Sequence, residues 1–115
     1  MLAFGEGLLL ATRSGVDRDL ARQVMTSSSI GSPMLKGRAP LVFDLPAEAW
    51  FTLGLEQKDV GLARDLGRDL GVPLPTAERA DAILDRARDL GYADRDLATL
   101  VEVLDHLGPQ RSEAA

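Results

Sequence analysis

Apolar residues recur at intervals of three and four along most of this chain, which is the spacing of one face of an α-helix. The alternation that marks a half-buried strand extends no further than Leu41-Val42-Phe43. The fold class is therefore predicted to be all-α, with five helices. Their expected bounds are about 2–13, 18–28, 47–70, 77–90 and 95–107.

Glycine follows four of the five predicted helices, because it adopts the left-handed stop conformation without steric cost. The expected N-caps are Asp17, Thr76 and either Asp94 or Asp96, and Pro46 suits the first turn of the third helix. The stretch 27–46 contains three prolines, two glycines and four serines, and it is predicted to be a long loop.

Length and composition fit one globular domain, predicted over residues 1–108, followed by a flexible tail at 109–115. The chain has 115 residues, of which 45% are hydrophobic, and its net charge is −5. This acidic balance argues against binding to nucleic acid or to an anionic membrane surface. No cysteine occurs and the apolar run "GLLLA" is too short to span a membrane, so a cytoplasmic protein is expected.

The third predicted helix contains a lysine that is hard to place. Helical spacing puts Phe51, Leu55, Leu62 and Leu66 in one row, which predicts a buried stripe, yet Lys58 falls in the same row. One interpretation is a boundary lysine whose methylenes follow the core and whose ammonium reaches Asp65 or solvent. The other is a lysine in a cleft, where it presents positive charge to an anionic ligand.

The same predicted helix contains three glycines, Gly54, Gly61 and Gly67. Each costs about 1 kcal/mol relative to alanine if it lies in a helix interior. We therefore expect close neighbours at some of these positions to offset that cost.

The familiar motifs of catalysis and of metal binding are absent. The single histidine, His106, has no ligand-spaced partner, and no glycine-rich phosphate loop or Gly-x-Ser-x-Gly motif occurs. The serine cluster at 27–29 with Ser32 is interpreted as helix capping and turn formation, although its hydroxyls could also serve a ligand. No catalytic residue and no metal ligand is therefore assigned.

The segment "FTLGLEQKDVGLARDLGRDLGVPLP" resembles the Phe-x-Leu-x-Leu-x-x-Lys-Asp stretch, ending in Gly-x-Pro-x-Pro, of the β-hydroxyacid dehydrogenases typified by 3-hydroxyisobutyrate dehydrogenase. "EGLLLATRSGVD", "SSSIGS" and "GYADRDLATLVEVL" are similar to further family segments in the same order, from Glu6 to Leu104. The resemblance implies the C-terminal helical domain of such an enzyme, with the fold of the 6-phosphogluconate dehydrogenase C-terminal domain.

By matching positions, the resemblance implies that Phe51, Lys58 and Asp59 line the cleft near the nicotinamide end of NAD or NADP. It also implies an N-terminal Rossmann domain and a catalytic lysine that would lie upstream of Glu6. The chain by itself is therefore expected to be inactive, with weak or no cofactor binding. Self-association through exposed helix faces is expected, and the alternative function is a freestanding helical interaction module.

Overall fold

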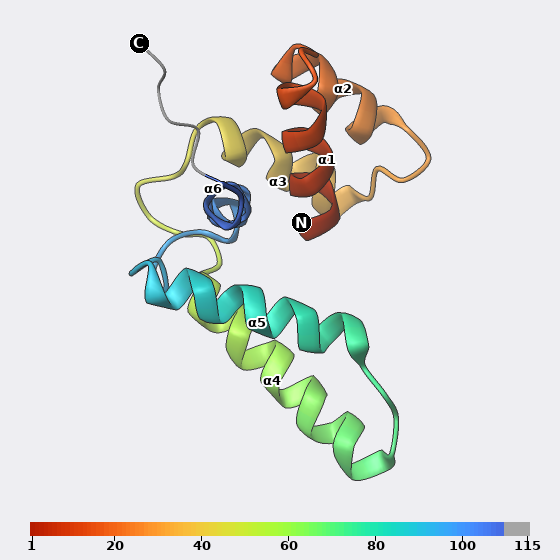
Figure 1. Ribbon diagram of the computed structural model, residues 1–115, viewed down its shortest axis with the longest axis vertical. Helices are drawn as coiled ribbons and strands as arrows, with labels where there is room; N and C mark the ends of the chain where they lie inside the picture. The colour runs from red at the N-terminus through yellow and green to blue at the C-terminus, as the bar shows by residue number, and fades with distance from the viewer. Residues whose placement is uncertain (110–115) are drawn as a thin grey trace. The chain divides into compact units, whose positions relative to one another are not determined.

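The computed structural model describes residues 1–109, and over that range the chain forms six α-helices, one 3-10 turn and no strand (Figure 1). In chain order the helices are α1 (Leu2–Arg13), α2 (Arg18–Ser27), α3 (Pro33–Phe43), α4 (Leu53–Leu70), α5 (Pro75–Asp89), the 3-10 turn η1 (Leu97–Thr99) and α6 (Leu100–Leu107). The all-α prediction is confirmed, with one more helix than expected.

The chain divides into two compact units. The first contains residues 1–44 together with the chain from Leu100 onward, and the second contains residues 45–99. The single domain over 1–108 stays a prediction. The predicted flexible tail, 109–115, lies outside the described residues from position 110 onward.

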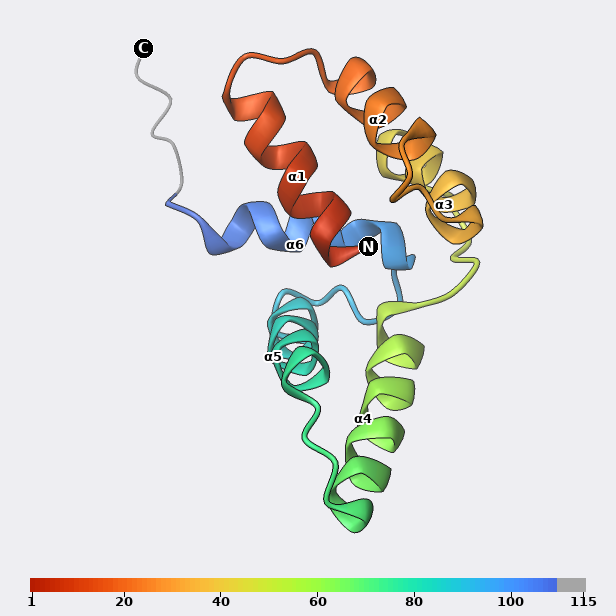
Figure 2. The same ribbon diagram turned by 90° about the vertical axis from the view of Figure 1, so that its right-hand side faces the viewer.

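The first unit packs α1 against α6 and against α2, and α2 against α3 (Figure 2). Its core contains Phe4, Leu8, Ala21, Leu35, Ala39 and Val101. Gly5 lets α1 and α6 approach closely, since a Cβ atom at that position would lie only 2.8 Å from Cδ1 of Leu104. This close approach fixes how the two helices cross.

The caps of the first two helices follow the sequence. Asp17 accepts a hydrogen bond at 2.9 Å from the backbone N–H of Leu20, and Gly15 has a φ of 94°. Helical spacing of the large apolar residues in 18–28 predicts that Leu20 and Val24 face inward. The structure differs, because Ala21 is buried and both of these residues are exposed.

Exposed charges support the first turn of α2. Hydrogen bonds from Arg22 and then from Gln23 hold the pKa of Asp19 below its ordinary value. The ion pair between Arg22 and Asp19 joins residues three positions apart at 2.6 Å. An acidic side chain there also suits the positive end of the helix dipole.

The long loop predicted over 27–46 is wrong, because its central part forms α3. Pro33 occupies the first turn, where no backbone N–H is needed, and Ser32 caps the helix by accepting from Leu35 N–H at 3.1 Å. Leu35 and Ala39 are buried one turn apart in the core of the first unit. Tertiary burial therefore stabilises a segment whose composition is typical of a loop.

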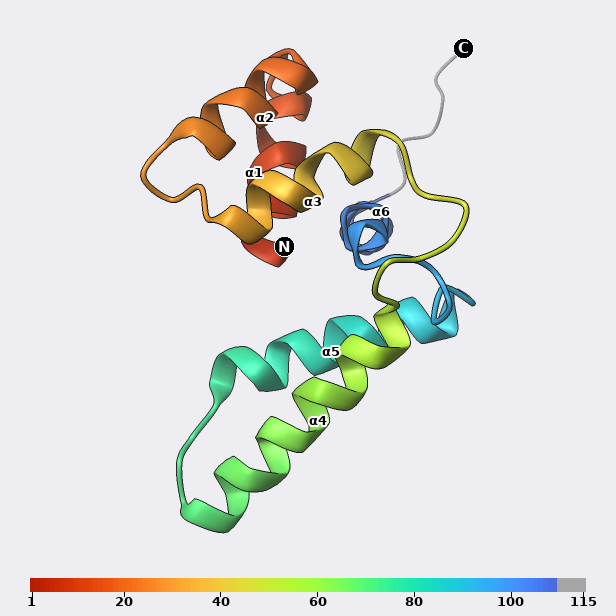
Figure 3. The ribbon, with the colours of Figure 1, turned by 180° about the vertical axis from the view of Figure 1, so that it is seen from behind.

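The second unit is built on a hairpin of α4 and α5, which run antiparallel (Figure 3) and are joined by residues 71–74. Gly71 adopts the left-handed conformation that ends α4, as predicted. Between the two helices the contacts are partly polar. Gln57 donates to the carboxylates of Asp81 and Asp85, and Arg64 forms an ion pair with Asp81.

Two predicted helix starts are wrong. The helix expected from residue 47 begins at Leu53, where Thr52 caps it by accepting from Leu55 N–H at 3.1 Å. The helix expected after a Thr76 cap begins one residue before that threonine, with Pro75 in its first turn. Proline has the φ angle that a first helical turn needs, at Pro46 as well as at Pro75, but only Pro75 begins a helix. Composition alone therefore does not identify the start of a helix.

The glycines of α4 give a matched pair of variants. Gly67→Ala should lower the free energy of unfolding by about 1–3 kcal/mol, because its Cβ would lie 2.7 Å from Leu74 Cδ1 and 3.0 Å from the carbonyl oxygen of Val72. Gly61→Ala should raise it by about 0.5–1 kcal/mol, because no atom lies within 4 Å of the added Cβ. Urea denaturation of both variants measures the difference, and equal shifts would contradict the packing argument.

Candidate functional site

Phe51 lies in an extended segment immediately before α4, and the carboxylate of Asp96 holds that segment. Asp96 is only 3% exposed. Its Oδ2 accepts from the backbone N–H groups of Trp50 at 2.9 Å and Phe51 at 3.3 Å, and its Oδ1 accepts from Ala98 N–H at 2.9 Å. One buried side chain therefore joins the start of α4 to the turn η1.

Backbone hydrogen bonds continue this connection into the first turn of α4. The N–H groups of Leu53 and Gly54 donate to the carbonyls of Arg95 and Ala93 at 3.0 and 2.8 Å. These are donors that a helix cannot satisfy internally. A Cβ on Gly54 would approach the carbonyl oxygen of Ala93 to 3.2 Å, which accounts for this second glycine.

Lys58 and Asp59 are both exposed on α4. At about 100° per residue, Lys58 lies about 40° to one side of Leu62 and Asp59 about 60° to the other. Within residues 1–109 no ion pair joins Lys58 to Asp65, which pairs instead with Arg68 at 3.2 Å. The ammonium group of Lys58 is therefore exposed to solvent on the surface of α4.

The leucines between these two charges are exposed, so the predicted buried stripe is wrong. Leu55, Leu62 and Leu66 are 45%, 60% and 58% exposed. The reason is that α4 packs on α5 with its opposite side, where Leu53 and Gly67 are buried. We call Leu55, Leu62 and Leu66 the leucine row. Lys58 and Asp59 flank this row on opposite sides, about one turn from Leu55 and one turn from Leu62.

The other candidates from the sequence have structural roles. Ser27 and Ser28 donate to carbonyls of α2 at 2.7 and 2.8 Å, and Ser32 caps α3, so the capping interpretation is confirmed. His106 lies on α6 with its Nε2 3.9 Å from a carboxylate oxygen of Glu102. In the part of the chain that the structure describes, no three His, Cys, Asp or Glu side chains gather into a possible metal site.

The role of Asp96 is not predicted from the sequence. The sequence indicates only a possible cap for the last helix, because nothing in the spacing of Asp96 indicates a contact with residues 45 positions earlier in the chain. The available signal was weak: two aspartates two residues apart in "ADRD", between a glycine and an apolar run. Only the fold shows which of them is buried.

Residues 1–109 are thus built from helices, and α4 carries the exposed leucine row with Lys58 on one side and Asp59 on the other. Residues 1–104 match the family described as "NAD-binding of NADP-dependent 3-hydroxyisobutyrate dehydrogenase", and the chain belongs to that family. This confirms the resemblance to the β-hydroxyacid dehydrogenases.

Individual relatives support the same family assignment. The chain is 35% identical over 104 residues to glyoxylate/succinic semialdehyde reductase 1 of Arabidopsis thaliana, covering 90% of this chain and 36% of the relative. It is 29% identical to L-threonate dehydrogenase of Escherichia coli K12, covering 88% and 33%. A crystal structure of 3-hydroxyisobutyrate dehydrogenase from Salmonella typhimurium superposes with a TM-score of 0.80 at 29% identity, covering 88% of this chain and 35% of that one. The chain thus spans about a third of the length of these proteins.

Proposed function

We propose that this chain is the C-terminal domain of an NAD(P)-dependent β-hydroxyacid dehydrogenase, and that the leucine row forms one wall of its cofactor cleft. The observation that carries the proposal is the placement of Lys58 and Asp59 on opposite edges of an exposed apolar strip. A body that contacts both charges would lie against the face of α4 that carries the leucine row. The proposed body is a dinucleotide together with the Rossmann domain that binds it.

The chemistry of this face fits a dinucleotide. An ammonium group suits a phosphate or another anionic part of the ligand, and a carboxylate can accept hydrogen bonds from ribose hydroxyls. Leu55 and Leu62 offer apolar surface to a planar ring, and Phe51 adds an aromatic side chain from a segment whose backbone is held by Asp96. When bound, the cofactor would exchange a hydride with the substrate.

The role proposed for these residues is positioning and exclusion of water. Lys58 and Asp59 would orient the ligand, while the leucine row would keep water from the reacting end. The general acid and the phosphate-binding loop belong to the expected upstream chain, so this chain by itself is proposed to be inactive.

Self-association is part of the same proposal, and the second candidate function is a freestanding helical interaction module. Both are supported by the exposed apolar side chains, among them Leu10 and Leu62, which are 72% and 60% exposed. No helix among residues 1–109 is long and apolar enough to cross a membrane. A cytoplasmic location and the absence of nucleic-acid binding stay predictions.

Nucleotide titration tests the cofactor proposal. Adding NAD or NADP to the isotope-labelled chain, up to about 10 mM, should shift the amide resonances of Phe51, Lys58 and Asp59 with an apparent Kd in the millimolar range. The affinity is expected to be weak because a single wall cannot enclose the ligand. Lys58→Ala should reduce these shifts by about fivefold or more, while leaving the unfolding midpoint unchanged, because Lys58 is exposed.

Lys36→Ala is the matched control, since Lys36 is an exposed lysine on α3. It should leave the nucleotide-induced shifts unchanged. Equal effects of the two substitutions, or shifts that cluster away from α4, would contradict the proposal. No response to either nucleotide would favour the interaction module.

A further inference from the structure

A small pocket lies within the second unit, between the extended segment that leads into α4 and the chain around Asp96. Its volume is about 270 Å³. This is just below the range of about 300–1,000 Å³ that is typical of ligand pockets, so the pocket suits a small ligand. One wall is apolar and includes Leu45, Pro46 and Ala49, whereas the other is polar and includes Asp94, Asp96 and Thr99.

The polar wall contains a hydroxyl group that no other group uses. Thr99 is 1% exposed, and its Oγ1 has no hydrogen-bond partner within residues 1–109. No other buried side-chain nitrogen or oxygen in that range lacks a partner. An unpartnered buried hydroxyl costs free energy, and most buried polar groups are hydrogen-bonded. A threonine that lines a pocket and keeps an unused hydroxyl is therefore a candidate to bind a ligand.

Negative charge predominates on the same wall. Asp94 is exposed, and within residues 1–109 no hydrogen bond or ion pair involves its carboxylate. Asp96 adds a second, buried carboxylate. The cation of this wall, Arg95, has its guanidinium carbon 3.9 Å from the centroid of the Tyr92 ring, whose face stabilises a positive charge. Two carboxylates against one guanidinium favour a ligand that is positively charged.

Hydrogen bonds join the two walls of the pocket at one end. The carboxylate of Asp96 accepts from Trp50 N–H at 2.9 Å, and the N–H of Leu97 donates to the carbonyl of Phe51 at 2.9 Å. These contacts fix the end of the extended segment against the polar wall. The pocket is therefore formed before a ligand arrives, which lowers the entropic cost of binding.

We propose that this pocket binds a primary ammonium ion carried on a short apolar chain. The ammonium group has three N–H donors and no acceptor. It donates to Oγ1 of Thr99 and is attracted by the carboxylates of Asp94 and Asp96, while the apolar chain contacts Leu45 and Ala49 on the opposite wall. The proposal is independent of nucleotide binding, because it uses none of the residues assigned to the cofactor.

Other cations suit the pocket less well. A quaternary ammonium ion has no N–H group to donate to Thr99, so it leaves the hydroxyl without a partner. A metal ion needs several ligands, and within residues 1–109 no three His, Cys, Asp or Glu side chains gather. A primary ammonium ion therefore matches both the charge of the wall and the unused hydroxyl.

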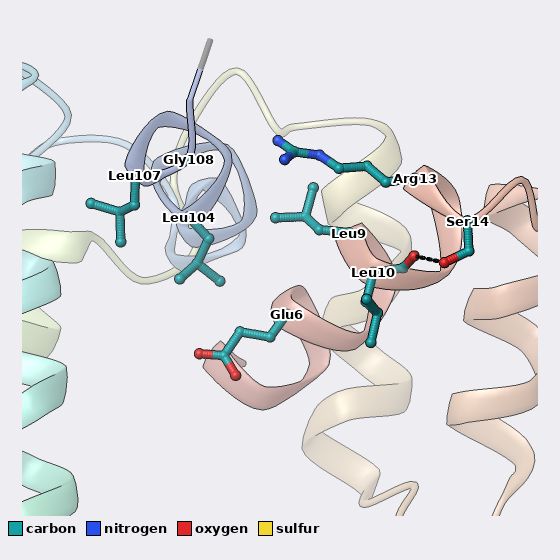
Figure 4. Close-up of a pocket in the computed structure, with 8 residues that line it drawn as sticks. All are labelled: Glu6, Leu9, Leu10, Arg13, Ser14, Leu104, Leu107 and Gly108. Atoms are coloured by element: carbon teal, nitrogen blue, oxygen red, sulfur yellow. Dashed lines mark hydrogen bonds between the residues drawn. The ribbon is translucent and has the colours of Figure 1, made fainter. Parts of the chain in front are cut away.

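The larger groove between α1 and α6 in the first unit provides an internal reference (Figure 4). It also combines leucines with an exposed carboxylate, that of Glu6. Its other polar side chains already have partners, because Arg13 pairs with Asp105 and Ser14 donates to the carbonyl of Leu10 at 2.8 Å. This groove tests whether a carboxylate beside apolar side chains is sufficient to bind an alkylammonium ion.

Titration of the isotope-labelled 115-residue chain with n-butylammonium chloride at constant ionic strength tests the proposal. The amide resonances of Ala47, Asp94 and Thr99 should shift and saturate with a Kd of about 1–20 mM. Neither butyrate nor 1-butanol should produce saturating shifts, because both lack the positive charge. Equal shifts at Glu6, or no saturation below about 100 mM n-butylammonium, would overturn the proposal.

Substitution of Thr99 separates binding from stability. Thr99→Val removes the hydroxyl and should weaken n-butylammonium binding about fivefold or more, without lowering the urea midpoint of unfolding, since valine has no polar atom to leave unpartnered. Thr99→Ser keeps the hydroxyl and should retain most of the affinity. A Thr99→Val chain that binds as tightly as the unchanged chain, or a Thr99→Ser chain that binds as weakly as Thr99→Val, would contradict the role of Oγ1.

Substitution of Asp94 tests the role of charge. Asp94→Asn should weaken binding about threefold or more, because it removes the unpaired carboxylate of the polar wall. Asp69→Asn is the matched control, since Asp69 is an exposed aspartate of α4 that does not line the pocket. It should leave the affinity unchanged. Equal effects of the two substitutions would show that only the net charge of the chain matters and would overturn the proposed site.

A free small amine and a lysine side chain of another polypeptide share this chemistry, and two probes distinguish them. The first is n-butylammonium, and the second is Nα-acetyl-lysine N-methylamide, which carries the same alkylammonium group on a peptide backbone. Tighter binding of the lysine probe assigns the pocket to a lysine of another polypeptide, and tighter binding of n-butylammonium assigns it to a free amine. Binding of neither probe overturns the proposal, and the nucleotide titration is unaffected by that outcome.

Discussion

Replacing Asp96 by alanine should lower the free energy of unfolding by about 2–4 kcal/mol. The carboxylate is 3% exposed and accepts from three backbone N–H groups, those of Trp50, Phe51 and Ala98. Alanine leaves these donors without an acceptor, and at least one of them lies in a buried region. Hydrogen bonds to a charged group contribute more than neutral ones, so the loss should exceed that of an ordinary cap.

Trp50 makes this effect directly measurable. It is the single tryptophan of the chain and lies in the segment that Asp96 holds, so its fluorescence during urea denaturation reports on the second unit. Asp96→Asn should cost less than alanine, since the amide keeps one carbonyl oxygen as an acceptor. Asp94→Ala is the matched control, because Asp94 is exposed two residues away, and it should change stability by less than about 0.5 kcal/mol. Equal effects of Asp94→Ala and Asp96→Ala would show that the proposed hydrogen bonds contribute nothing.

The Asp96 substitution also bears on the proposed cofactor wall. If the carboxylate orients Phe51, nucleotide-induced shifts should weaken in Asp96→Asn under conditions where the variant is still folded. Shifts that stay at full size in a folded Asp96→Asn chain would limit Asp96 to stability.

Leu8→Ala should lower the free energy of unfolding by about 2–5 kcal/mol. Leu8 is fully buried in the core of the first unit, together with Phe4 and Val101. Removing its side chain loses the burial of the missing methyl groups and also leaves a cavity, because the surrounding helices can collapse only in part.

Thermal unfolding followed by far-UV circular dichroism measures this loss. Leu10→Ala is the control from the same helix, since Leu10 is mostly exposed and its truncation should cost less than about 0.5 kcal/mol. Equal melting temperatures for Leu8→Ala and Leu10→Ala would contradict the packing of α1 against α2 and α6. Both variants are best compared at low concentration, because self-association would make the unfolding temperature depend on concentration.

The errors on α4 and α2 have one cause: helical spacing identifies an apolar face without saying what covers it. Leu55, Leu62 and Leu66 fall on one face of a helix by their spacing, and so do Ile83, Leu84 and Ala87. The second set is buried, whereas the first set is exposed. On α2 the same ambiguity exposes Leu20 and buries Ala21. Spacing is a property of one helix, whereas burial depends on its neighbours.

The sequence by itself determined the all-α class and the caps at Asp17 and Gly71, since these depend on local backbone conformation. It also determined the family, since the matching segments occur in the same order. Tertiary structure alone decided that a proline-rich stretch forms α3, that α4 begins at Leu53, and that Asp96 binds the segment holding Phe51. The physical reason is the distance along the chain over which each kind of interaction acts. Caps and stop signals act within one helical turn, whereas burial and the Asp96 hydrogen bonds join residues that are distant in the chain.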